Sequence, residues 1–383
     1  TTVRPYNGTP TPFMDDTPIF AGYMWTRTPT VDGWEHASIA QQYADAGIHL
    51  YAFDIGAGGP SPEWCGPGPG LDSPYDFGTV EARLGRILDV DPEARFHFRV
   101  YLEMRQQWWY DTYPQEREVD STGAPLTQSL ASTLWREQAK EFLRQYIAHL
   151  EALGVADRAF AYQTGAGHTG EWVKGLTSMR APCGDYSAPM ACAFQSWLRE
   201  RYVEAEALQA AWADSSVSFE TAAVPSAQEQ LHTTHQTFRD PRREQPVIDY
   251  YRCLADLCAD LIIDFNRTVK EATKGQVLAG AFYGYLMELA WNAGFFSEGP
   301  DSLYSTYQRS GHLGLAKVLR SPYVDFLVSP YSYGFRGIGG HGAAMPPIDS
   351  LRLHGKLYIY EDDTRTYLAP PDAGFGRAAS LTD

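Results

Sequence analysis

The sequence predicts an α/β protein built as a (β/α)8, or TIM, barrel. Two observations favour this fold. Short apolar strands alternate along the chain with amphipathic helices, which is typical of βα units and of a parallel sheet. Polar and aromatic residues follow several of these strands directly, and the carboxyl-terminal rim of a barrel is where so many strand ends converge. An open doubly wound sheet is disfavoured, because no Gly-rich turn follows the first strand.

Seven segments are rich in the aromatic and β-branched residues that favour strands. They are 19–25, 49–56, 95–104, 158–164, 277–286, 324–331 and 356–361. Apolar residues recur at three- and four-residue spacing over 80–88, 130–153 and 249–273, which predicts connecting helices. The residues after Glu361 are too few for another helix and strand. We therefore expect one catalytic barrel domain over 1–383 with an insertion at about 175–246, and an eighth strand and further domains beyond Asp383.

Composition and charge exclude several classes of protein. Hydrophobic residues make up 44% of the chain and charged residues 20%, which excludes a disordered protein. The net charge of −16 repels nucleic acid and anionic lipid, so neither is an expected partner, and no apolar run is long enough to span a membrane. The five cysteines lack metal-ligand spacing, which favours buried thiols. We expect no cofactor and no metal, and a soluble protein for which the cytoplasm is favoured over secretion. Export stays open, as does assembly into a homo-oligomer.

The loop after the fourth predicted strand carries the first candidate catalytic residue. In the segment 160–172 (FAYQTGAGHTGEW), three glycines lead from the strand to Glu171 and Trp172. A carboxyl group beside an indole loses hydration, which raises its pKa toward the range that a general acid needs. The alternative is a solvated glutamate on an exposed loop.

The end of the seventh predicted strand carries the second candidate. The segment 358–366 (YIYEDDTRT) runs from an alternating strand into Glu361, Asp362, Asp363 and Arg365. A neighbouring arginine relieves the repulsion among the carboxylates and keeps one of them ionised, as a nucleophile requires. An acidic surface turn or a metal site is the alternative interpretation.

Together the two glutamates suggest a reaction. An acid/base and a nucleophile roughly 5 Å apart are what retaining glycoside hydrolysis needs. The aromatic content of 14% agrees with a sugar site, since sugars stack their C–H faces on aromatic rings, although many aromatic residues serve the core. We expect a glycoside or oligosaccharide as substrate.

Three stretches resemble family 42 glycoside hydrolases, the β-galactosidases of a large barrel clan. The most specific is 194–212 (FQSWLRERYVEAEALQAAW), and 108–116 (WWYDTYPQE) and 249–272 are similar to two further elements of that family. The resemblance implies a retaining, exo-acting, β-galactosidase-like enzyme with Glu171 as acid/base and Glu361 as nucleophile. Gly170 departs from the clan's asparagine at that position, and the family's cysteine cluster for a metal is absent, so the sugar need not be galactose.

Residues near strand ends are candidates for binding the substrate. They are Asp54, Glu103, Arg105, Trp108, His168, Trp172, Tyr285, Tyr331, Arg336, Asp363 and Arg365. Two other functions remain open at this point: a non-catalytic carbohydrate-binding barrel, and a metal-dependent hydrolase that uses Glu361, Asp362 and Asp363.

Overall fold

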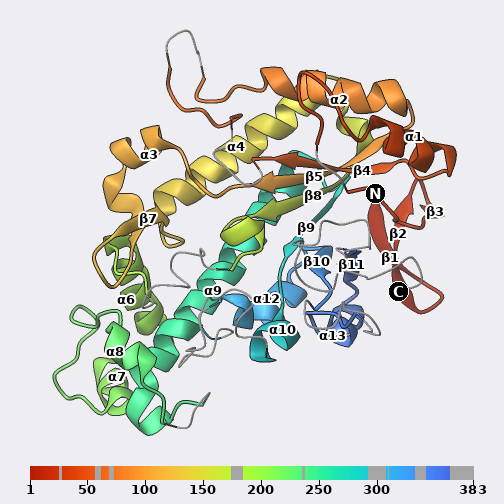
Figure 1. Ribbon diagram of the computed structural model, residues 1–383. Helices are drawn as coiled ribbons and strands as arrows, with labels where there is room; N and C mark the ends of the chain where they lie inside the picture. Colours follow the sequence, from red (N-terminus) through yellow and green to blue (C-terminus); the bar gives the residue numbers. More distant parts are fainter. Residues whose placement is uncertain are drawn as a thin grey trace, which may run out of the picture.

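A curled parallel sheet forms the centre of the protein. The computed structural model describes residues 1–25, 28–56, 62–68, 73–173, 184–234, 238–291, 308, 310–332 and 342–362. Within them the sheet contains β4 (Leu50–Ile55), β5 (Arg95–Tyr101), β8 (Ala159–Gly165), β9 (Leu278–Phe282), β10 (Phe326–Pro330) and β11 (Leu357–Glu361). The strands lie side by side in chain order (Figure 1). A doubly wound sheet would reverse that order, so the sheet belongs to a barrel-type α/β fold.

Six of the seven predicted strands are confirmed, and the first is not. In 19–25 only Met24 pairs with the sheet, through a parallel bridge to Tyr51. The Met24 amide donates to the Leu50 carbonyl at 2.9 Å, and the Ala52 amide donates to the Met24 carbonyl at 2.9 Å. One residue thus takes the place predicted for a whole strand.

The sequence analysis missed a small antiparallel sheet at the amino terminus. It consists of β1 (Thr2–Tyr6), β2 (Thr9–Met14) and β3 (Thr17–Pro18). Asn7 and Gly8 join β1 to β2 with positive φ angles of 50° and 77°, as a tight hairpin turn requires. The Asn-Gly pair was the available signal, but the prolines around it argue against a strand unless the strand lies at an edge.

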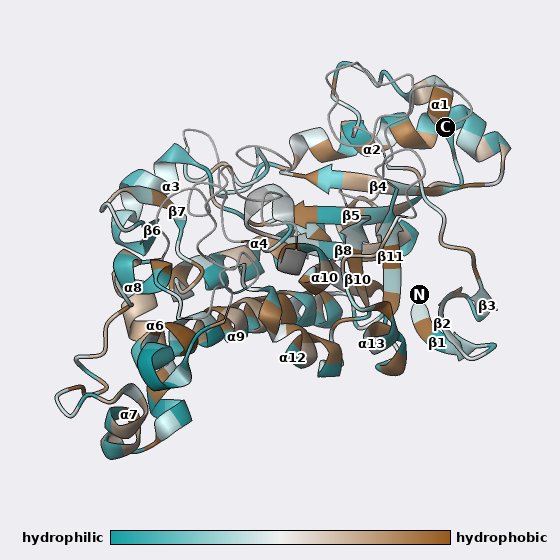
Figure 2. Ribbon diagram, turned by 60° about the horizontal axis from the view of Figure 1, so that its bottom comes forward, coloured by the Kyte–Doolittle hydropathy of each residue, from teal (hydrophilic) through white to brown (hydrophobic). Residues whose placement is uncertain are grey.

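Helices cover the outer face of the sheet. They include α1 (Ala37–Asp45), α2 (Gly78–Val90), α4 (Thr133–Ala152), α9 (Pro241–Ala272), α12 (Leu315–Arg320) and α13 (Ile348–Leu353). In Figure 2 several of them alternate between teal and brown along their length, the pattern of helices that bury one side. The three predicted helices are confirmed, and α9 begins earlier than predicted because Asp240 caps it despite Pro246 inside. Across the described ranges no helix is both long and apolar enough to cross a membrane.

The predicted insertion packs around the amino-terminal half of α9. It contains α6 (Ala188–Tyr202), α7 (Ala205–Trp212) and α8 (Ala227–Leu231), which lie together at one end of the molecule (Figure 1). Val203, with φ of 62°, separates α6 from α7. The buried Asp249 of α9 accepts hydrogen bonds from the Tyr202 hydroxyl at 2.7 Å and the Trp212 indole at 2.9 Å. These bonds tie the insertion to the barrel.

The cysteines are only partly where the composition predicted. Cys253 and Cys258 are buried on α9, as expected for core thiols. Cys192 is exposed and Cys65 is half-buried, so the prediction of a buried thiol is wrong for Cys192. Cys183 lies outside the described residues.

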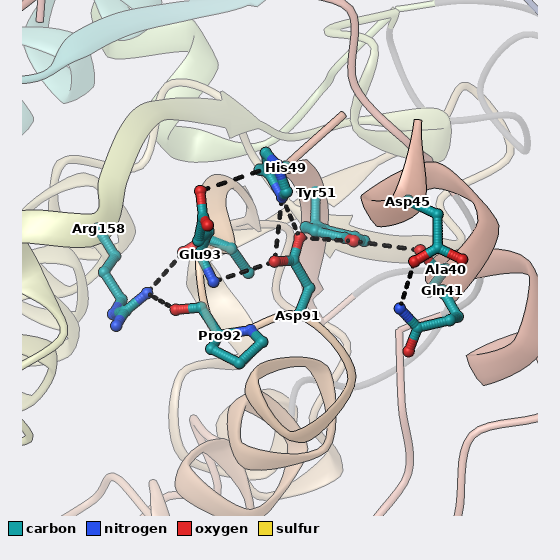
Figure 3. A network of polar contacts seen from close by, with 10 residues as sticks. Ala40, Gln41, Asp45, His49, Tyr51, Asp91, Pro92, Glu93 and Arg158 are labelled. Atoms are coloured by element: carbon teal, nitrogen blue, oxygen red, sulfur yellow. Dashed lines mark hydrogen bonds and ion pairs between the residues drawn. The ribbon is translucent and has the colours of Figure 1, made fainter. Parts of the chain in front are cut away.

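A polar network stabilises the sheet at the amino-terminal ends of its strands. Asp91, 2% exposed, accepts hydrogen bonds from the His49 imidazole at 2.9 Å, the Tyr51 hydroxyl at 2.9 Å and the Glu93 amide at 3.0 Å (Figure 3). All three groups donate to the same buried carboxylate, and these bonds lower the cost of burying the charge of Asp91. In barrels this end supports stability, and the opposite rim carries chemistry.

Candidate active site

The carboxyl-terminal ends of the strands bring the candidate residues together. Asp54 lies one residue before the end of β4, Tyr101 ends β5, and Glu361 ends β11. Glu171 follows β8 after a short turn, His168–Gly170, and Tyr285 follows β9. Because all these strands are parallel, the side chains meet at one rim of the sheet.

Glu171 is buried, in contrast to the solvated alternative. It is 8% exposed, and its Oε1 accepts a hydrogen bond from the Tyr285 hydroxyl at 3.0 Å. The Thr169 hydroxyl donates to Oε2. The pKa of Glu171 is raised to about 7: burial is the main cause and the charge of Glu361 adds to it, while the Thr169 and Tyr285 hydroxyls and Arg99 act in the opposite direction. A carboxyl group with this pKa can hold and release a proton near neutral pH.

His312 fixes the Glu171 loop against the segment that carries Tyr285. Its Nε2 lies 2.9 Å from the Glu171 carbonyl oxygen, and its Nδ1 accepts from the amides of Gly284 and Tyr285, both at 3.1 Å. Two N–H donors at Nδ1 require a neutral ring with its proton on Nε2. Burial lowers the pKa of His312 to about 3, which agrees with that tautomer.

Arg99 joins the other two carboxylates. Its Nε lies 3.3 Å from Oδ1 of Asp54, and its Nη1 lies 3.7 Å from Oε1 of Glu361. Side-chain exposure is 7% for Arg99, 14% for Asp54 and 13% for Glu361, so the group is largely removed from water. A buried guanidinium this close offsets part of the cost of burying the two carboxyl groups. The Trp25 indole also donates to Asp54 Oδ2 at 3.3 Å.

An open cavity of about 690 Å³ reaches this group. Its lining includes residues 19–23, Trp25 and β11 with Asp362. Arg99, Gln163 and Phe282 of the sheet also line it. Among the described residues β11 pairs with β10 alone.

Trp172, the indole predicted beside the Glu171 carboxyl group and as a substrate contact, packs in the core. Trp172 is 1% exposed, and its indole donates to the Thr164 carbonyl at 3.0 Å while its ring packs against Phe265 of α9 at 5.9 Å. The prediction that Trp172 binds substrate is therefore wrong, because its ring lies in the core and offers no face to a sugar. Trp172 has a positive φ of 57°.

Other residues predicted to bind the substrate contact neighbouring protein residues. Glu103 forms an ion pair with Arg105 and is largely buried, which raises its pKa. Trp108 packs over Gly66, and its buried indole nitrogen has no hydrogen-bond partner in the described part of the chain. Tyr331 donates to Asp362 and stacks on Tyr360 with ring centres 4.3 Å apart.

Some predicted residues cannot be placed. Arg336, Asp363 and Arg365 lie outside the described residues, as does the side chain of His168. In the described part of the chain, no three His, Cys, Asp or Glu side chains are grouped so as to hold a metal ion. The predicted metal alternative depended on Asp363 and is not tested by this finding.

Position 170 has no room for a side chain. A Cβ atom there would lie 2.3 Å from Cε1 of Tyr101, and Gly170 has φ of 78°. Where the family that the sequence resembles has asparagine, this chain has Gly170, and the Tyr101 ring occupies the space that a side chain would need.

Sequence reasoning missed Arg99, Tyr101 and His312. Arg99 lies inside a largely buried strand (RFHFRVY), and a charged residue at such a position is a signal of a paired, functional group. His312 follows no predicted strand and carried no comparable signal.

No family model matches the chain, and no curated protein matches its sequence. Solved structures with a similar fold include the catalytic domain of β-amylase from Paenibacillus polymyxa, with a TM-score of 0.63 and 11% identity over 89% of this chain and 85% of that one. The β-galactosidases of Marinomonas ef1 and Bacillus circulans sp. alkalophilus have TM-scores of 0.53 and 0.52, at 15% and 13% identity over 82% and 93% of this chain. The chain spans 41% and 52% of those two proteins. At these identities the likeness concerns the fold, and it supports an α/β barrel.

Proposed function

We propose that the protein is a retaining, exo-acting glycoside hydrolase that cleaves a β-linked, galactose-like sugar, and that it is a divergent relative of family 42. One observation carries the proposal: a buried glutamate with a pKa of about 7 lies in the electrostatic field of a second glutamate that an arginine holds. Two carboxyl groups in opposite protonation states are what the double-displacement reaction needs. The likeness to β-galactosidases and a β-amylase supports the same class of substrate.

The first half of the reaction assigns one role to each glutamate. Glu361, ionised beside Arg99, attacks the anomeric carbon and forms a glycosyl ester as the bond to the leaving oxygen breaks. Glu171 gives its proton to that oxygen. Since Tyr285 donates to Oε1, the proton resides on Oε2, where the Thr169 hydroxyl can turn to accept it.

In the second half Glu171 acts as a base. It is now ionised and removes a proton from water, which attacks the anomeric carbon and releases Glu361 with net retention of configuration. Formation of the covalent ester removes the negative charge of Glu361, so the pKa of Glu171 falls. Glu171 is then ionised at the step in which it must accept a proton from water.

A screen of chromogenic glycosides tests the proposal. We expect the wild type to hydrolyse at least one β-glycoside, and Glu171→Gln and Glu361→Gln to lose about 100- to 10,000-fold in kcat. Glu244→Gln is the matched control, because Glu244 is also a buried, ion-paired glutamate but lies at the start of α9. Sugar binding without turnover by the wild type would instead indicate a carbohydrate-binding barrel, and loss of activity on chelation would indicate a metal-dependent hydrolase.

A further inference from the structure

The ring of Tyr101 lies directly on the backbone that leads to Glu171. Two glycines make this possible. A Cβ atom at Gly170 would come within 2.3 Å of the Tyr101 ring, and one at Gly165, which pairs with Tyr101 across β5 and β8, would come within 2.7 Å of the Gly170 carbonyl oxygen. Any side chain at either position would displace the ring or the loop, so the two glycines and the tyrosine form one packing unit.

The Tyr101 hydroxyl has one of its two hydrogen-bonding roles unused. Its oxygen accepts from Arg99 Nη2 at 2.8 Å. Within the described part of the chain no acceptor takes the hydroxyl proton, and Tyr101 is half-buried at the end of its strand. A half-buried donor without an acceptor is costly unless water or a ligand satisfies it.

The surroundings keep this donor protonated. Burial raises the pKa of Tyr101, Arg99 lowers it, and the charges of Asp54, Glu361 and Glu171 raise it again. The hydroxyl therefore lies within the field of all three carboxyl groups of the candidate site. With its pKa raised, the Tyr101 hydroxyl remains a neutral O–H near neutral pH.

We propose that Tyr101 contacts the substrate and donates its phenolic O–H to a hydroxyl group of the sugar held between Glu171 and Glu361. This inference rests on the proposed function and names a determinant of its specificity. Arg99 orients the tyrosine oxygen, and the same guanidinium contacts Glu361, so the donor and the nucleophile are held by one group. A sugar hydroxyl can accept this proton and still donate to a carboxylate.

Tyr101→Phe tests the inference, because it keeps the ring on Gly170 and removes only the hydroxyl. We expect kcat/KM on the glycoside cleaved by the wild type to fall about 10-fold, the loss of one neutral hydrogen bond. A series of monodeoxy glycosides then locates the partner. Removal of one particular sugar hydroxyl should lower kcat/KM of the wild type. The same removal should leave kcat/KM of Tyr101→Phe unchanged, since that variant already lacks the hydrogen bond. Tyr51→Phe, which loses a hydroxyl at the opposite end of the sheet, is the control and should retain wild-type kcat/KM.

The outcomes separate this inference from the proposed function. If the wild type hydrolyses no glycoside, both are overturned. If the wild type is active and the Glu171 and Glu361 variants are not, equal sensitivity of wild type and Tyr101→Phe to every deoxy position overturns the role of Tyr101 alone. Thermal unfolding of both tyrosine variants shows that each is folded during the assay.

Discussion

Arg99 of β5 contacts Glu361 of β11 with 3.7 Å between Nη1 and Oε1, although the two strands lie four places apart in the sheet. In a flat sheet that separation would be about 19 Å, at roughly 4.8 Å per strand. The sheet must therefore curl strongly for the side chains to meet. The same curl places Glu361 near enough to Glu171, which follows β8, for its charge to raise the pKa of Glu171.

Replacing Arg99 should separate activity from stability. Arg99→Met leaves Asp54 and Glu361 largely buried without their cation, so we expect a loss of about 3–5 kcal/mol in the free energy of unfolding. Turnover should fall about 100-fold or more, because the carboxylate that attacks the sugar loses the cation paired with it. Urea unfolding and kcat measure the two effects.

Arg136→Met is the matched control for Arg99→Met. Arg136 forms an ion pair with Asp264 at 2.8 Å on the outer helices. Arg136→Met should lower the free energy of unfolding and leave kcat unchanged. Equal kcat in Arg99→Met and wild type would contradict the role given to Arg99.

The pH dependence of activity should report Glu171. Its pKa of about 7 in the folded protein means that the acid form is lost as pH rises above that value. We expect kcat/KM of the wild type to decline above pH of about 7. The residual kcat/KM of Glu171→Gln should not show this alkaline decline. An unchanged alkaline limb in Glu171→Gln would assign the acid to another group. Rates from pH 5 to pH 9 at constant ionic strength provide the measurement.

Glu171 should also make the protein less stable as pH rises. Its pKa is higher in the folded state than the ordinary value of 4.5, so the folded protein binds the proton more tightly between pH 4.5 and about 7. The free energy of unfolding should fall through that range, by about 3 kcal/mol at most. Glu171→Gln removes this contribution, so its stability relative to wild type should increase from pH 5 to pH 8. A relative stability that does not vary with pH would contradict the burial of this carboxyl group.

His312 should act by holding the Glu171 loop. His312→Ala removes the contacts to the Glu171 carbonyl and to two amides, and we expect about 3 kcal/mol lower stability and about 10-fold lower kcat. The pKa of His312 is lowered to about 3, so its contribution is present above pH 6.5 and is lost as pH falls toward 3. The stability of the variant should therefore vary less with pH in this range.

His49→Ala is the control for His312→Ala. His49 bonds to Asp91 at the far end of the strands (Figure 3). It should lower stability without lowering kcat. If both histidine variants lose the same fraction of kcat, the effect is one of general stability and not of the loop.

The sequence predicted the strands well because alternating apolar segments and helical spacing are local signals. It failed at 19–25, where only Met24 pairs, since the pairing of a segment depends on its neighbours and not on its own composition. The two glutamates were predicted because each follows a strand. Burial raises the pKa of Glu171 in the predicted direction, while the Trp172 ring packs against Phe265. The contacts of Glu171 with Tyr285 and His312 join residues more than a hundred positions apart, and no local pattern encodes them.

The most direct test of the account is rescue of Glu361→Gly by azide. Removing the side chain leaves space beside Arg99 for a small anion, and azide can then attack the anomeric carbon from the side on which Glu361 stands. For a β-glycoside that the wild type hydrolyses, we predict restored release of the aglycone and an α-glycosyl azide, identified by nuclear magnetic resonance. A β-glycosyl azide from this variant, or full activity without azide, would contradict the assignment of Glu361 as the nucleophile.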